Sequence, residues 1–249
     1  MGRGVDDTVI RQLRAHPGGV VAHPMAATLT PDQGSCKAVN RKRSLAASST
    51  RGGRGRMMWS TPKLEEEPVR KLTAGLFMSV DGVVESPNLF QFDSFDAELG
   101  AGMGRLMSTV TTAVLGRHGY EEWSSYWPEA PADDAFGAFI NPIEKLVASR
   151  TLTGDLGWNA TLIEGDVVAA LTALKRTDGG DISLFATISL TRQLLFAGVL
   201  DELTLMMHPV VAGSGRRLFE PDDPTTRLTL VRSEITSAGN ALLTYALRA

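Results

Sequence analysis

Hydrophobic and polar positions alternate with two different periods along residues 70–249, and the changes of period predict strands and helices in turn. Short apolar runs predict buried strands at KLTAGLFMSVDG, TTAVLG, IEKLVAS, ATLIEG and DISLFA. Apolar residues at helical spacing predict helices after Asp96, after Asp166 and from about Leu190, and Gly198 suits the end of the last helix. Strand and helix therefore alternate as far as Gly198.

After Asp201 the pattern changes to three strand-like stretches with no helix between them. These stretches are ELTLMMHPVV, RLTLVRSEI and NALLTYALR. Alternation followed by consecutive strands predicts an α/β fold with a mixed, mostly parallel central sheet, helices on both faces and a C-terminal antiparallel strand pair. The body from residue 69 to 249 has the length of one domain.

Residues 1–68 show no sustained period and contain turn and basic segments such as HPGG, RKRS and SSTRGGRGR. Such a segment buries too little apolar surface to offset the entropy lost on ordering, so we expect a disordered basic extension. It is interpreted as an extension translated from an upstream start, with Met57 or Met58 as the native start. A nucleic-acid arm or an Arg-rich transit peptide are the alternatives.

Composition is that of an ordinary soluble globular protein, with 43% hydrophobic and 21% charged residues. The charge is uneven, because residues 1–70 hold 12 basic and 6 acidic side chains and the rest hold 13 and 22. Cys36 is the single cysteine, which excludes an intrachain disulfide framework and fits a reducing, cytoplasmic location. No apolar run approaches the roughly 18 residues of a membrane helix, and the histidines lack metal-ligand spacing.

Polar residues follow the predicted strands, where the carboxyl ends of an open sheet form a ligand crevice. Asp81 is either a substrate contact or part of a simple Asp-Gly turn. In residues 116–119 the glycines permit close backbone approach and Arg117 and His118 offer donors to phosphate. The alternative is that Arg117 pairs with a nearby glutamate.

Three further loops carry candidate chemistry. Residues 149–151 combine hydroxyls with a guanidinium, which suits a phosphate or an ordinary polar loop. Residues 186–189 join a strand to a helix, where backbone N–H groups bind phosphate in nucleotide-binding folds. Residues 213–217 hold Gly-Ser-Gly and two arginines, which is a weak motif or a flexible hairpin.

Taken in order, these stretches resemble the dihydrofolate-reductase-like superfamily, in the branch similar to the C-terminal reductase domain of bifunctional riboflavin-biosynthesis enzymes. The matching pieces are MSVDGVVE, LGRHGYEEW, VASRTL, GDVVAALTALK and the long segment from Asp181 to Phe219. The resemblance covers roughly residues 70 to 249. It implies a three-layer fold, NADPH as cofactor, a homodimer, and hydride transfer to a pterin- or pyrimidine-like ring or a carbonyl.

The resemblance also implies site residues by position. The cofactor-binding residues would be Gly116, Arg117, His118, Gly119, Ser149, Arg150, Thr151, Ala186, Thr187, Ile188 and Ser189. The substrate-side residues would be Ser79, Asp81, Gly82 and Val84. Either Asp81, the catalytic candidate, or an ordered water would supply the proton that hydride transfer requires. No metal is implied.

The chain departs from the family pattern at two places. Gly119 stands where the family usually has Thr, and Ala186-Thr187-Ile188 replaces a glycine-rich turn. Because a β-branched residue resists positive φ, we expect Ile188 either to strain this turn, by about 1–3 kcal/mol, or to reshape it. A fold-retaining protein that binds a nucleotide or small ligand without turnover is therefore a second hypothesis, and a nucleic-acid-associated protein working through the basic tail is a third.

Overall fold

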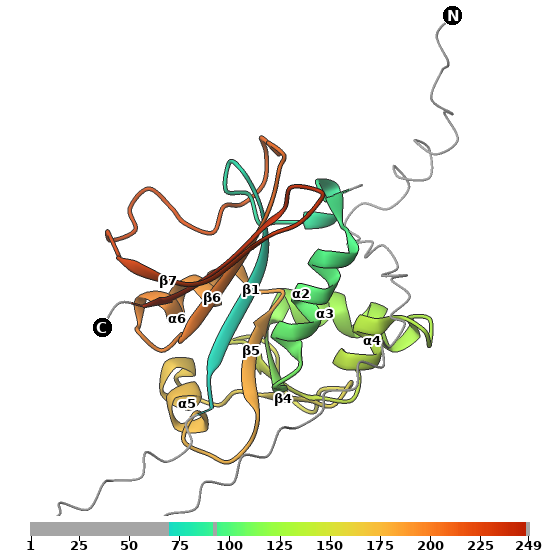
Figure 1. The fold of residues 1–249 in the computed structure, drawn as a ribbon. Coiled ribbons are helices and arrows are strands. Elements are labelled where there is room, and N and C mark those ends of the chain that lie inside the picture. The colour runs from blue at the N-terminus through green and yellow to red at the C-terminus, as the bar shows by residue number, and fades with distance from the viewer. Residues whose placement is uncertain (1–69, 92–93, 248–249) are drawn as a thin grey trace, which may run out of the picture. The chain divides into compact units, whose positions relative to one another are not determined.

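The computed structural model describes residues 70–91 and 94–247, so the predicted N-terminal extension lies outside the described residues. Within that part, eight strands form one sheet in the order β4-β3-β2-β5-β1-β6-β8-β7 (Figure 1). The strands are β1 (Leu72–Ser79), β2 (Val110–Gly116), β3 (Glu144–Ala148), β4 (Ala160–Leu162), β5 (Asp181–Phe185), β6 (Glu202–His208), β7 (Leu228–Ile235) and β8 (Ala241–Leu247).

Strands β1 to β6 pair in parallel, and β8 runs antiparallel to both β6 and β7. This mixed sheet with a C-terminal antiparallel pair is the arrangement that the strand and helix pattern predicts. The connections between parallel strands cross over the sheet, which places helices on its faces. The sheet order also sets β3, β2, β5 and β1 side by side, so their carboxyl ends form one continuous edge.

Helices cover both faces of the sheet (Figure 1). They are α2 (Ala97–Met107), α3 (Arg117–Tyr126), α4 (Ala135–Ile140), α5 (Val167–Leu174) and α6 (Ile188–Phe196). Helices α5 and α6 pack their leucines against Leu72, Ile182 and Leu203 in the largest apolar core. Helices α2, α3 and α4 lie on the opposite face with two smaller apolar clusters. The result is the three-layer arrangement expected from the resemblance.

The helix starts fall into two groups. Asp96, Asp134 and Asp166 cap α2, α4 and α5, because each carboxylate accepts a hydrogen bond from a backbone N–H of the first turn. Helices α3 and α6 begin after Gly116 and Thr187 with no side-chain cap. Both follow the carboxyl end of a parallel strand, and among the described residues no N-cap side chain accepts a hydrogen bond from their first turn.

Two helices differ from the sequence predictions. Residues 116–119 are predicted as a phosphate turn after a strand, and residues 117–119 of that turn are the start of helix α3. The short helix α4 was not expected. The aromatic residues Tyr120, Trp123 and Tyr126 of α3 lie at helical spacing, but the segment opens with Arg-His-Gly, which has the composition of a loop. Within the described residues, none of the helices combines the length and the apolar character that crossing a bilayer requires.

Candidate functional site

The predicted phosphate turns come together at the carboxyl edge of the sheet. Gly116 ends β2 and pairs with Ala148 at the end of β3, while Leu115 pairs with Phe185 at the end of β5. The turns at 116–119, 149–151 and 186–189 therefore lie on three neighbouring strands. An open parallel sheet binds ligands at this edge.

The first and third turns are in direct contact. A Cβ atom added to Gly116 would lie 2.9 Å from the Thr187 hydroxyl oxygen. A Cβ atom added to Gly119 would lie 2.5 Å from the Ala186 carbonyl oxygen. The two uncapped helix starts thus converge on one small region, where free N–H groups and the positive ends of two helix dipoles favour an anion.

The expected conflict at Ile188 does not arise. The positive φ of this turn falls on Ala186, at +46°, whereas Ile188 is the first residue of α6 and is not among the residues with positive φ. A methyl group tolerates the left-handed region better than a β-branched side chain does. The turn is therefore reshaped so that its smallest residue takes the strained position.

The side chains around these turns are partly engaged with one another. Arg117 donates to both carboxylate oxygens of Glu121, at 3.1 and 3.0 Å, and lies 2.9 Å from His118 Nε2. His118 itself is 85% exposed. The structure therefore shows the glutamate pairing considered for Arg117, at the rim of the anion region.

The second turn is shaped by Ser149. Its hydroxyl accepts hydrogen bonds from the backbone N–H groups of Thr151 and Leu152, at 3.1 and 2.9 Å. Arg150 is exposed, and within the described part of the chain its guanidinium has no hydrogen bond or ion pair. Arg150 is thus a cation beside this edge that an anionic ligand can take without breaking an existing pair. On the third turn, the Ser189 hydroxyl already accepts a hydrogen bond from Arg216, at 2.9 Å.

Asp81 is fully engaged by its neighbours. Its carboxylate accepts from the Ser79 hydroxyl at 2.7 Å and from the N–H groups of Ala212 and Gly213 at 2.9 and 3.0 Å, and Arg217 lies 3.4 Å away. The hydrogen bond from Ser79, followed by those from the backbone, lowers the pKa of Asp81 to about 2. Asp81 is therefore ionised at neutral pH and ties the loop after β1 to the 209–217 loop.

The other residues predicted on the substrate side share this structural environment. The Ser79 side chain is completely buried and Val84 packs in the large apolar core. Gly82 has φ +86° at the turn. The geometry thus favours an anchoring role for residues 79–84 over direct substrate contact.

A cavity of about 280 Å³ lies elsewhere, on the face of the sheet that carries α2, α3 and α4. Its floor is formed by six residues at alternate positions of three adjacent strands, namely Thr73, Gly75, Ser183, Phe185, Thr204 and Met206. Its walls include Met103 of α2, Trp123 of α3 and Phe136 of α4. Phe185 immediately precedes Ala186, so the cavity adjoins the third turn. Motif-based reasoning missed these residues, and only the alternation of side chains within each strand hints at them.

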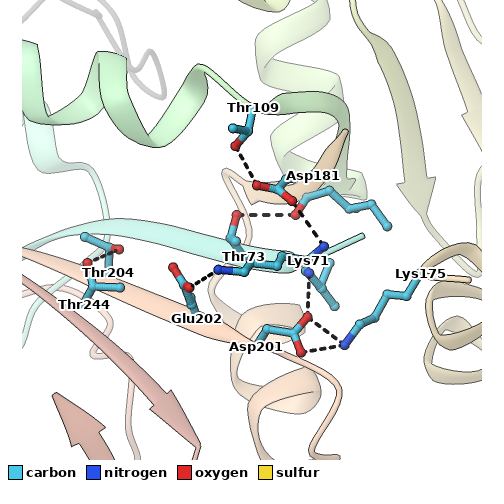
Figure 2. A network of polar contacts seen from close by, with 11 residues as sticks. Lys71, Thr73, Thr109, Lys175, Asp181, Asp201, Glu202, Thr204 and Thr244 are labelled. Atoms are coloured by element: carbon cyan, nitrogen blue, oxygen red, sulfur yellow. Dashed lines mark hydrogen bonds and ion pairs between the residues drawn. The ribbon is translucent and has the colours of Figure 1, made fainter. Parts of the chain in front are cut away.

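The opposite end of the cavity reaches the amino edge of the sheet, where charged residues form a polar network (Figure 2). Lys71 pairs with Glu202 at 2.7 Å, and Asp181 accepts from the Thr109 hydroxyl at 2.6 Å. The pKa of Lys71 is raised, chiefly by the hydrogen bond from its ammonium to Glu202. This end of the cavity is therefore bordered by charges of both signs.

A buried histidine lies at the carboxyl edge beside β1. His208 pairs in register with Ser79, and its Nδ1 atom lies 2.6 Å from the Ser94 hydroxyl. Its ring packs against Phe77 and Phe90. Burial lowers the pKa of His208, while Asn240 and Asp96 oppose that shift. His208 thus ties Phe90, Gln91 and Ser94 to the sheet as a neutral ring. Within the described ranges, no cluster of His, Cys, Asp and Glu is arranged to hold a metal ion.

Comparisons with known proteins agree with this geometry. The model of the RibD C-terminal domain matches residues 70–242. The uncharacterized protein YyaP of Bacillus subtilis is 26% identical over 179 residues, which cover 71% of this chain and 94% of YyaP. A candidate riboflavin biosynthesis protein from Shewanella sp. PV-4 has a similar solved structure, with a TM-score of 0.55, 18% identity, and coverage of 72% of this chain and 99% of that one.

A pyrimidine reductase-like protein from Corynebacterium diphtheriae is also similar, with a TM-score of 0.53, 16% identity, and coverage of 72% of this chain and 92% of its own. At such identities the solved structures establish the fold alone. They confirm the dihydrofolate-reductase-like fold class that the sequence predicts.

Proposed function

Because the chain belongs to the RibD C-terminal domain family, we propose that it is a reductase that uses NADPH to reduce a small heterocyclic or carbonyl compound. The fold and family are those of reductases. The cofactor and the class of substrate are what we propose. One observation carries it: the two uncapped helix starts of α3 and α6 converge beside a cavity with an aromatic wall.

The residues at the carboxyl edge fit a dinucleotide phosphate. Gly116 and Gly119 let the backbone approach closely, and the first N–H groups of α3 and α6 would bind the pyrophosphate. Arg150 would pair with the phosphate that distinguishes NADPH from NADH, since its guanidinium is not committed elsewhere in the described part of the chain. When bound, the nicotinamide supplies the hydride.

The protein supplies orientation and exclusion of water. Trp123, Phe136 and Phe185 place an aromatic surface next to the third turn, against which a flat ring packs. Asp81 is held as a carboxylate, so we assign delivery of the proton to a water molecule rather than to Asp81. Asp81 then acts as a positioning residue for the 209–217 loop.

Calorimetric titration of the full chain with NADPH and NADH tests the proposal. We expect NADPH to bind at least tenfold more tightly than NADH, and Arg150→Ala to remove most of that preference. Arg176→Ala is the matched control, because Arg176 is an exposed arginine at the end of α5. Absence of NADPH binding, or an equal loss of affinity in both variants, would contradict the proposal.

A ligand-binding protein without turnover is the second candidate. It is favoured by the altered third turn, in which an alanine rather than a glycine takes the positive φ at residue 186. Tight NADPH binding with no consumption of NADPH in the presence of pterins, pyrimidines or quinones would support it. The homodimer and the cytoplasmic location implied by the sequence stay predictions, which sedimentation and cell fractionation would check.

A further inference from the structure

Ser183 on β5 is a buried polar group without an internal partner. Its side chain borders the cavity, the residue is only 6% exposed, and within the described residues its hydroxyl makes no hydrogen bond. The hydroxyl oxygen is not among the fully enclosed, unpaired atoms of the described residues, so it opens on the cavity. The hydroxyl is therefore available to a molecule inside the cavity.

The neighbours of Ser183 extend this polar floor. Thr73 lies directly opposite Ser183 in the β1–β5 register, and its hydroxyl has one long contact of 3.4 Å to the Ile182 carbonyl. Thr204 lies on the next strand and is already paired with Thr244 at 2.9 Å (Figure 2). Ser183 and Thr73 are thus the two hydroxyls of the floor that remain open to a ligand.

The walls of the cavity restrict the shape of the ligand. The rings of Trp123, Phe136 and Phe185 lie within 5.4 to 6.1 Å of one another at the end nearest the third turn. From Phe185 the floor runs along β5 to Asp181, about 13 Å at a strand rise of about 3.3 Å per residue. A flat molecule longer than one ring fits this space, with its polar edge over Ser183.

The far rim of the cavity carries charges of both signs, the carboxylates of Asp181 and Glu202 and the cations of Lys71, Arg105 and Arg232. Lys71 is paired with Glu202 and Arg105 with Glu234, whereas Arg232 is exposed on the outermost strand. The rim therefore does not set the sign of a ligand's charge, and selection falls to the hydroxyls of the floor.

We propose that Ser183 is a specificity-determining residue, which selects flat, fused-ring ligands by hydrogen bonding to their polar edge. The inference rests on the proposed function for the role of the cavity, and it concerns residues that no phosphate turn contains. Binding to the cavity and binding of NADPH are therefore separable in experiment.

Two probes that differ only in their polar edge test the inference on the full chain. Quinazolin-4-one carries a lactam edge, whereas naphthalene has the same two-ring outline without it. Ligand-observed NMR titration should show that quinazolin-4-one binds and that Ser183→Ala weakens it about tenfold. Naphthalene affinity should change less than twofold in that variant, and Ser233→Ala on exposed β7 is the matched control.

A second variant locates the binding. A Cβ atom added to Gly75 meets only the flexible Met206 side chain, at 3.4 Å, so Gly75→Val fills the cavity within a strand that suits valine. We expect it to abolish binding of both probes and to leave NADPH affinity unchanged.

The outcomes separate this inference from the proposed function. Absence of quinazolin-4-one binding, equal loss of both probes in Ser183→Ala, or full binding in Gly75→Val overturns the role of Ser183. If NADPH binds normally in those experiments, the reductase proposal survives the loss of this inference. Failure of NADPH to bind contradicts the reductase proposal instead, whatever the probes do.

Discussion

Gly119 and Ala186 occupy one shared space between α3 and the turn after β5. A Cβ atom at Gly119 would lie 2.5 Å from the Ala186 carbonyl oxygen and 2.7 Å from the Ala186 Cβ atom. The two places where the sequence departs from its family pattern are therefore in contact. The methyl group gained at residue 186 takes space that a larger side chain at residue 119 would need.

We expect Ala186→Gly to raise the free energy of unfolding by about 1 kcal/mol, because glycine removes the cost of a left-handed alanine. Gly119→Ala should lower it by about 1–3 kcal/mol, since the new Cβ atom meets backbone that has little room to move. Urea unfolding of both single variants and the double variant measures the effects. The double variant should be less destabilised than the sum of the two, and strict additivity would contradict direct contact.

Asp81→Asn should loosen the 209–217 loop without altering the main core. The amide loses the charge that the Ala212 and Gly213 N–H groups and Arg217 favour. We expect faster hydrogen exchange at Ala212 and Gly213 and a lower Tm. Since the pKa of Asp81 is lowered to about 2, its contribution is present above about pH 3.8 and is lost as the pH falls toward 2. Unchanged exchange in Asp81→Asn would show that the carboxylate is not the anchor.

His208 should make the protein sensitive to mild acid. Burial lowers the pKa of His208 below the ordinary histidine value of about 6.5, so the unfolded chain binds a proton more readily than the folded protein. Stability is then complete above about pH 6.5 and falls as the pH drops below it. We expect thermal unfolding of His208→Gln to depend less on pH between about 7.5 and 5.5 than that of the unaltered chain. Equal slopes for the two proteins would remove His208 as the cause.

Lys145 should make the stability of the protein depend on pH in the alkaline range. It is fully buried, it donates to the carbonyls of Asn141 and Ile143, and burial lowers its pKa to about 8. Between pH 8 and 10.5 the unfolded chain keeps a proton that the folded protein has lost, so stability should rise with pH by up to about 3 kcal/mol. In Lys145→Met, the free energy of unfolding measured with denaturant should not change with pH over that range. If this free energy falls with pH in the unaltered chain, the prediction is wrong.

Much of the fold could be predicted from local periodicity. The β5 strand at DISLF and the α5 cap at Asp166 follow directly from apolar patterning and capping chemistry. Helix α3 was not predicted, because its first turn, Arg-His-Gly, has the composition of a loop. Gly119 in this turn lets the helix lie close to the Ala186 turn.

The cavity could not be predicted in the same way. Thr73, Ser183 and Thr204 are separated by long stretches of chain, and each is an ordinary strand residue in its own segment. Only the parallel register and the order β5-β1-β6 bring them to one floor. The Asp81 motif gives the residue type, whereas its partners come from the 209–217 loop and could not be read from the motif.

The alternation of side chains along β1, β5 and β6 has a consequence for how this protein can diversify. Residues such as Leu72, Ile182 and Leu203 serve stability, and their immediate neighbours Thr73 and Ser183 face the ligand space. Every second residue of these strands can therefore be substituted in evolution while the residues between them keep the chain folded. A scaffold built in this way can acquire new ligands by point substitution, with its core left intact.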